Sequence, residues 1–190
     1  MFLFKTQYTS ITGVILAGIL SASTTTVSAN DNLTITLGTK ASPATVAAAD
    51  LSITPDGDNL PAGSGTTTQG KAVFAAQCAS CHGADAKGGE GLADPLVGGI
   101  GTLTTDAPVK TVGSFWPYTS TLFDYIRRAM PLNAPLSLSN DEVYAVSAFI
   151  LSENGIIKPT AVMNAKTLPK VKMPNQDGSV SSWKEHQHND

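Results

Sequence analysis

The two cysteines of the chain, Cys78 and Cys81, stand in the stretch "QCASCHG", and His82 follows them directly. Two thiols at this spacing can form a disulfide, cycle as a redox pair, hold a metal or attach a cofactor. A zinc site needs four ligands, and the only further imidazoles belong to His186 and His188 at the far end of the chain. A thioredoxin-like pair requires a βαβ unit around it, which the flanking sequence does not predict.

The two remaining possibilities for this motif are a structural disulfide and haem attachment. A disulfide is common in exported proteins, but here it would close a very small loop and leave the small core unexplained. C-x-x-C-H is the attachment sequence for c-type haem. Cys78 and Cys81 would form thioethers with the two vinyl groups, and His82 would lie beneath the iron as its proximal ligand. The sequence therefore favours one covalently bound haem c, an apolar cofactor that would also complete the undersized core.

A sixth iron ligand has to come from another part of the chain. Met130 precedes Pro131 in a predicted loop between two helices, and such a loop can cross the opposite haem face with both ends held. We therefore predict His82 and Met130 as the axial ligands, a pair that raises the reduction potential relative to two imidazoles. The main alternative is Met173, in a tail for which the sequence predicts no scaffold; the remaining candidates are Met163, His186 and His188.

The first 29 residues resemble an export signal. They carry a single charge, Lys5, and an apolar run from Ile11 to Ala22, and they end in the A-x-A-like cleavage site Val27-Ser28-Ala29. The run is shorter than the roughly 18 to 20 residues that a membrane-spanning helix needs. We expect cleavage after Ala29 and a periplasmic protein without a membrane span; an uncleaved N-terminal anchor is the alternative.

The charge balance argues against one class of partner. The chain has 12 Lys and Arg against 15 Asp and Glu, a net charge of −3, and loss of residues 1–29 would remove only Lys5. Nucleic-acid binding needs basic side chains clustered on one face. We therefore expect no nucleic-acid partner.

The remaining chain divides into a leader over 30–67, a compact domain over 68–155 and a polar tail over 156–190. Within the domain, helices are predicted over 68–78, 120–130 and 140–153. We expect Thr68 to cap the first helix, Thr121 and Asp124 to form a capping box in the second, and Ser139 and Glu142 to form one in the third. No segment alternates enough to predict a sheet, so the fold class is all-α.

The residues of this domain resemble class I cytochromes c. The matching features are "FAAQCASCHG", Pro95-Leu96, Met130-Pro131 and the terminal helix "DEVYAVSAFIL". The resemblance implies three main helices around a covalent haem. It also implies a close helix crossing at Gly70, Phe74 and Phe149, and a proline carbonyl, here that of Pro95, that orients the proximal histidine.

A narrower resemblance covers nearly the whole mature chain. The stretch from Leu96 to Leu151 and the tail "LPKVKMPNQDG" are similar to the cytochrome subunits of sulfite and sulfur dehydrogenases, the Sox-type subunit included. This resemblance implies electron transfer without catalysis by the chain itself, from a molybdopterin-containing subunit to a downstream cytochrome. The single C-x-x-C-H departs from the dihaem members. Two alternatives remain: a free electron shuttle, or a haem enzyme whose Met130 is displaceable.

Three further groups of polar or aromatic side chains have candidate roles. Arg127 and Arg128 are candidates for neutralising a haem propionate, and each is equally compatible with a solvated helix end. Trp116 is a candidate for covering the haem edge or for core packing. Four tail lysines between Lys158 and Lys172 are candidates for an acidic partner surface, although exposed runs of this kind are commonly only solvated.

Overall fold

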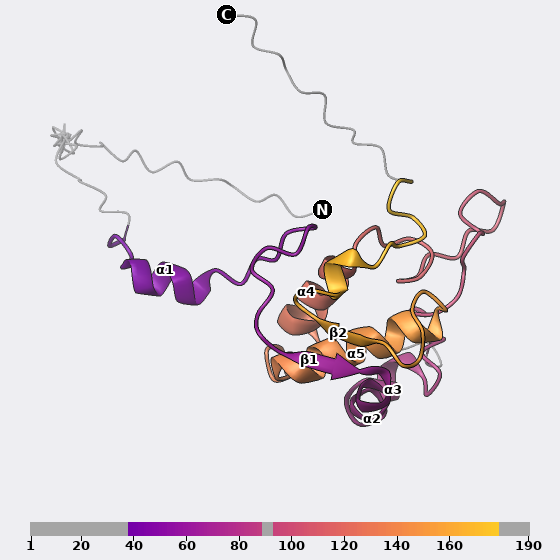
Figure 1. The fold of residues 1–190 in the computed structure, drawn as a ribbon, viewed down its shortest axis with the longest axis horizontal. Helices are drawn as coiled ribbons and strands as arrows, with labels where there is room; N and C mark the ends of the chain where they lie inside the picture. The colour runs from indigo at the N-terminus through magenta and orange to yellow at the C-terminus, as the bar shows by residue number, and fades with distance from the viewer. Residues whose placement is uncertain (1–37, 89–92, 179–190) are drawn as a thin grey trace, which may run out of the picture. The chain divides into compact units, whose positions relative to one another are not determined.

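The structure, a computed structural model, describes residues 38–88 and 93–178 (Figure 1). The expected signal peptide, residues 1–29, and both His186 and His188 lie outside the described residues. The chain divides into the units Met1–Ala41 and Ser42–Asp190, and the account below concerns the second unit.

The regular secondary structure of the described residues is mainly helical, as expected, but it contains more helices than the three predicted. The five α-helices and one short 3-10 helix are α1 (Pro43–Ala49), α2 (Thr67–Gln77), α3 (Ala79–His82), α4 (Thr119–Ala129), α5 (Asn140–Glu153) and η1 (Leu168–Lys170). The two strands are β1 (Ser64–Thr66) and β2 (Val162–Asn164). The sequence did not predict α1 in the leader, where Ser42 accepts a hydrogen bond from the Thr45 N–H and Pro43 occupies the first turn.

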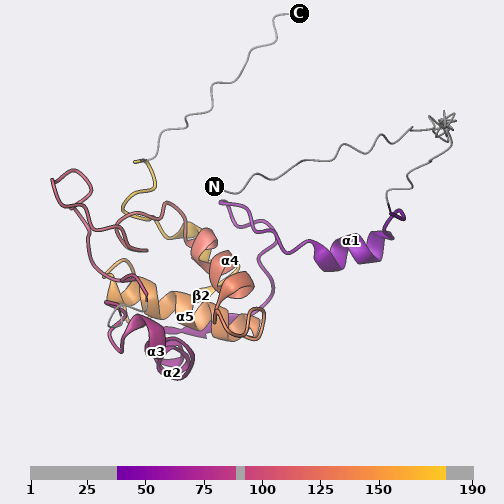
Figure 2. The same ribbon diagram turned by 180° about the vertical axis from the view of Figure 1, so that it is seen from behind.

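The centre of the fold is the crossing of α2 and α5, which Figure 1 shows with α2 nearly end-on below α5. A Cβ at Gly70 would overlap the Ala145 carbonyl group, so only glycine allows the two backbones this approach. Beside it the rings of Phe74 and Phe149 lie 5.0 Å apart and tilted by 45°. The crossing expected at Gly70, Phe74 and Phe149 is therefore present. Helix α4 packs on the other side of α5, as the reverse view shows (Figure 2).

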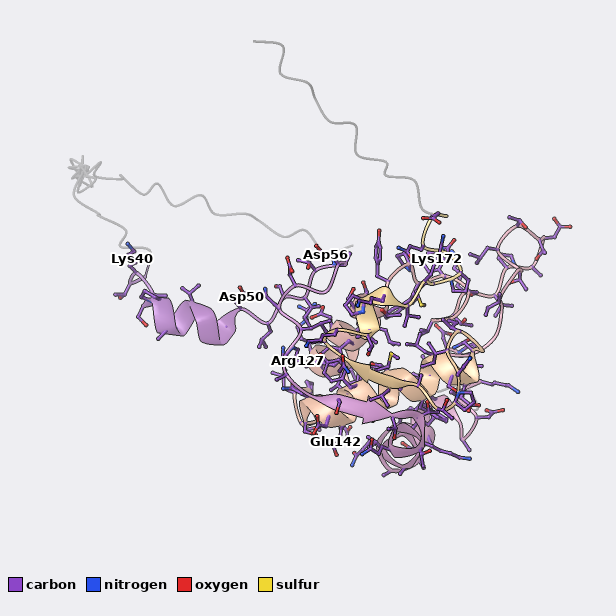
Figure 3. The ribbon with its side chains drawn as sticks, viewed as in Figure 1. Lys40, Asp50, Asp56, Arg127, Glu142 and Lys172 are labelled. Atoms are coloured by element: carbon purple, nitrogen blue, oxygen red, sulfur yellow. The ribbon has the colours of Figure 1, made fainter. Side chains whose placement is uncertain are left out.

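The predicted boundary of α5 is confirmed. Ser139 accepts a hydrogen bond from the Glu142 N–H, and the Glu142 carboxylate accepts one of 2.8 Å from the Ser139 N–H, which is the expected capping box. Figure 3 labels Glu142 at this end of the helix. Asn154 and Gly155 end the helix, and Gly155 has a left-handed φ of 69°.

The predicted starts of α2 and α4 were wrong. Helix α2 begins one residue before Thr68, and its capping box joins Thr66 to Gln69. Helix α4 has Tyr118 at its N-cap with no side-chain cap. The Asp124 carboxylate is instead paired with Arg128 one turn further along, because spacing alone does not decide whether an aspartate turns back to the cap or forward to a cation.

A small antiparallel sheet was not expected either. Strand β1 pairs with β2, with Gly65 opposite Met163. Strands of three residues are too short for alternation to show in the sequence. A Cβ at Gly65 would overlap the Ala145 backbone, so glycine is needed where β1 passes over α5.

Residues 53–61 of the leader and the described part of the tail pack onto the helices. In the tail, which we expected to be polar throughout, Met163, Leu168 and Met173 are buried in the hydrophobic core. These residues are five apart, a spacing that fits neither a helix nor a strand, which explains why the sequence pattern missed them. In the leader, the Pro55 carbonyl accepts a 2.7 Å hydrogen bond from Ser120 on α4.

Candidate functional site

Cys78, Cys81 and His82 lie on one turn of backbone where α2 ends and α3 begins. Cys78 is the C-cap of α2, and its N–H donates to the Phe74 carbonyl over 2.9 Å. The N–H groups of Cys81 and His82 both donate to the Cys78 carbonyl, over 3.1 and 3.0 Å. Both cysteines are free thiols; Cys78 is half-buried and Cys81 is exposed. The turn thus presents two thiols and an imidazole together.

The environment of these thiols opposes a redox role. Burial, and then the neighbouring Cys81, raise the pKa of Cys78 to about 11. A reactive redox cysteine needs a lowered pKa, because the thiolate is the nucleophile. The described residues also contain no group of three His, Cys, Asp or Glu side chains that could hold a metal ion. Neither a catalytic dithiol nor a zinc site is therefore supported within these residues.

The His82 ring faces a backbone carbonyl. Its Nδ1 lies 3.4 Å from the carbonyl oxygen of Asp94. Because a carbonyl can only accept, this geometry favours the proton on Nδ1 and leaves the lone pair on Nε2 for a metal. The resemblance had pointed to the carbonyl of Pro95, and the structure places that of the preceding residue here instead. Backbone carbonyls are identical in every residue, so no sequence signal distinguished the two.

Met130 lies on a different element from the C-x-x-C-H turn. It is the C-cap of α4, its N–H donates to the Ile126 carbonyl over 3.1 Å, and it packs partly buried against the same hydrophobic core as Cys78. The rival Met173 is only 1% exposed, within that core. A thioether enclosed by packing is less available to a metal than one at a partly exposed helix end, so Met130 stays the predicted ligand.

The residues of this region fit a haem. The chain segment after Met130 exposes Leu132 and Leu136, at 79% and 57%, and Tyr125 on α4 is 47% exposed. Exposed large apolar side chains of this kind are available to an apolar ligand or partner. With two thiols and an imidazole on one turn, the donor set is the one that covalent haem attachment requires.

The two arginines and the tryptophan have structural contacts of their own. Arg128 is paired with Asp124. Arg127, labelled in Figure 3, lies near Tyr144, and its positive charge partly offsets the rise in the pKa of that phenol. The Trp116 ring meets the Tyr125 ring edge-on, with 5.6 Å between centroids. These contacts leave the haem-propionate role of each side chain a prediction.

A surface hollow of about 770 Å³ lies at the other end of α4 from Met130. Tyr118 and Thr119 line it from the helix start, and Lys166 and Lys170 line it from the tail. It contains none of the cysteine or histidine side chains described above, so it is separate from the candidate haem site.

Comparisons with known proteins show the family to which the chain belongs. The model of the family described as cytochrome C oxidase, cbb3-type, subunit III, matches residues 65–150, which include the C-x-x-C-H turn and Met130. A chain in the crystal structure of the sulfane dehydrogenase SoxCD from Paracoccus pantotrophus is 40% identical to this chain. The two superpose with a TM-score of 0.73, over 82% of this chain and 76% of that one. The chain belongs to the cytochrome c family, as a Sox-type cytochrome.

A search of curated protein sequences found no match. Within residues 38–88 and 93–178, none of the helices has the length and apolar character to cross a membrane.

Proposed function

We propose that this chain is the electron-transfer subunit of a periplasmic sulfur-compound dehydrogenase and carries one covalently bound haem c. The observation that supports this most directly is the 40% identity to a chain of the sulfane dehydrogenase SoxCD, which extends over most of both chains. The C-x-x-C-H turn supplies the matching chemistry. The export pattern of residues 1–29 supports the periplasmic location.

Four side chains would hold the cofactor. Cys78 and Cys81 would form the thioethers, and His82 and Met130 would be the axial ligands. The haem, when bound there, supplies one-electron chemistry between Fe(III) and Fe(II). The Asp94 carbonyl would keep the His82 proton on Nδ1, and the end of α4 would present the Met130 sulfur.

This arrangement assigns substrate oxidation to a partner. With His82 and Met130 both bound to the iron, the chain would offer no open coordination position for a sulfur oxyanion. A molybdopterin-containing subunit would oxidise the substrate. The present chain would accept its two electrons one at a time and pass them to a downstream cytochrome.

The test is purification of the protein from the periplasm under mild conditions, with molybdenum and haem measured in the same sample. We expect one haem per chain, co-purifying molybdenum, and reduction of the haem on addition of sulfite or, separately, thiosulfate. If molybdenum is absent and neither compound reduces the haem, the dehydrogenase-subunit proposal is overturned. The free electron shuttle then becomes the better description.

The same preparation distinguishes the haem-enzyme alternative. We expect the oxidised protein to show a sulfur-to-iron charge-transfer band that persists with added cyanide or peroxide. Met130→Ala should abolish the band, whereas Met173→Leu, which preserves core packing, should leave it. The opposite pattern would make Met173 the ligand, and a band lost to added ligands would support a displaceable Met130.

A further inference from the structure

The contact between His82 and the Asp94 carbonyl is sensitive to small movements. Its 3.4 Å length is longer than that of most N–H···O hydrogen bonds, which reach about 3.2 Å. Such bonds weaken steeply with distance and misalignment, so a shift of the loop that carries Asp94 by a few tenths of an ångström would form or break it. The groups that fix this loop therefore matter for the imidazole.

One anchor of the loop comes from the chain just after the C-x-x-C-H turn. The N–H groups of Leu96 and Val97 donate to the Ala86 carbonyl over 2.8 and 3.2 Å. Ala86 is fully buried, and its own N–H donates to the Gly83 carbonyl over 3.2 Å. These bonds hold the loop two and three residues after Asp94.

The second anchor is a side chain on a different element. The Nδ2 of Asn154, at the end of α5, donates to the carbonyls of Leu96 and Ile150 over 3.1 and 2.9 Å. Its Oδ1 accepts from the Gly98 N–H over 3.0 Å. The amide thereby uses both of its N–H donors and its oxygen, which fixes its orientation. Asn154 bridges the end of α5 to the loop on both sides of Val97.

We propose that Asn154 is a positioning residue for His82. By holding the Leu96 carbonyl and the Gly98 N–H, it sets where the Asp94 carbonyl meets the imidazole Nδ1. The proposal rests on the proposed function, because its consequence is expressed through His82 as an iron ligand. A bond from Nδ1–H to a carbonyl makes the imidazole a more basic ligand and favours the oxidised iron. Loss of Asn154 should weaken that bond and raise the reduction potential.

A substitution at a buried glycine, Gly113, would move the same amide without changing Asn154 itself. Gly113 packs directly on the Asn154 side chain, and a Cβ at that position would overlap the Asn154 Oδ1. Gly113→Ala should therefore displace the amide without removing it. It should change the His82 contact in the same direction as Asn154→Ala.

The experiment uses the haem-loaded full-length protein and two measurements. Nitrogen-15 NMR follows the exchange of the His82 Nδ1 proton with deuterated water, and spectroelectrochemistry gives the reduction potential. In Asn154→Ala we expect the exchange to be about fivefold to tenfold faster, the equivalent of one lost hydrogen bond, and the potential to shift upward. Asn140→Ala is the matched control, because its amide donates over 3.2 Å to the Ala62 carbonyl at the other end of α5.

The outcomes separate positioning from general loosening. Equal changes in Asn154→Ala and Asn140→Ala, or no change in the exchange and the potential, would overturn the proposal. If Asn154→Ala fails to retain haem, Gly113→Ala and Asn154→Asp decide in its place. The aspartate keeps the acceptor for Gly98 and loses the donor to Leu96, and unchanged values in both variants would overturn the proposal. A wild-type protein that carries no haem would instead refute the proposed function.

Discussion

The phenol of Tyr144 on α5 donates a 2.8 Å hydrogen bond to the backbone carbonyl of Pro61, which fastens the leader to the helix. The Tyr144 side chain is fully buried, and burial raises its pKa to about 12, so the hydroxyl keeps its proton. Its ring packs on that of Phe123, with 4.4 Å between centroids. One side chain therefore joins α4, α5 and the leader.

Tyr144→Phe should remove the hydrogen bond and keep the ring packing. We expect a loss of about 1 kcal/mol in the free energy of unfolding, because the Pro61 carbonyl loses its donor. Limited proteolysis should show faster cleavage in the leader near Pro61. Tyr125→Phe, at a half-exposed ring on α4, is the control and should change neither quantity. A leader equally resistant in both variants would contradict this account of the fastening.

Gly70→Ala should separate α2 from α5. Because the added methyl would overlap the Ala145 carbonyl group, the helices must move apart, and the Phe74–Phe149 contact must change with them. Strain of this kind costs about 1 to 3 kcal/mol. Denaturant unfolding of the haem-loaded protein measures it, with Ala76→Ser on the exposed side of α2 as the control. A stability equal to the control would mean that the crossing is looser than described.

Glu142 should make the stability of the domain depend on pH. Hydrogen bonds from the Ser139 N–H and hydroxyl hold the pKa of the Glu142 carboxyl below its usual value of 4.5. A carboxyl whose pKa is lower in the folded than in the unfolded state stabilises the fold above the unfolded value. That contribution is lost as the pH falls through the folded value.

Glu142→Gln tests this dependence, because a glutamine can still accept the Ser139 hydrogen bonds but does not titrate. We expect the free energy of unfolding to decrease more steeply in the wild type than in the variant as the pH is lowered from neutral to below 4.5. The difference between the two proteins should therefore shrink in acid. Parallel pH profiles would show that the capping carboxylate contributes no charge-dependent stability.

Cys78 and Cys81 should each attach the haem independently. Either single cysteine-to-serine variant should retain the cofactor through the remaining thioether when the protein is extracted with acidified acetone. The double variant should release it, because His82 and Met130 bind only through reversible coordination. Absorbance of the extracted and precipitated fractions measures the outcome. Extraction of haem from the wild type would exclude covalent attachment.

The parts of the fold that the sequence predicted are those with local signals. Helix α5 has its capping box, its apolar side chains and its terminal Asn154-Gly155 within one continuous segment, so its limits were predictable. Strands β1 and β2 come from distant segments of the chain, and each has only three residues, too few for an alternating pattern to predict a strand. The burial of Met163, Leu168 and Met173 was missed for the same reason, since only tertiary packing makes them core residues.

The candidate site shows a similar division. The C-x-x-C-H residues lie within five consecutive positions, so their chemistry could be inferred from their spacing, and the structure places them on a single turn. The contacts around the imidazole could not be inferred from the sequence, because they use the Asp94 backbone carbonyl and the Asn154 amide from the end of α5. The Asn154 side chain bonds residues 56 and 58 positions earlier in the chain, and the sequence indicated only that this asparagine ends a helix.

The pairing of β1 with β2 has a consequence for the order in which the protein is completed. A nascent chain emerges from its N-terminus, so the segment with Cys78, Cys81 and His82 appears well before Val162–Asn164. Until Asn140–Glu153 emerges, α2 has no α5 to pack on, and until Val162–Asn164 follows, β1 has no strand to pair with. The two thiols therefore stand on an incompletely packed chain while the later segments emerge, which leaves them accessible to a modifying enzyme.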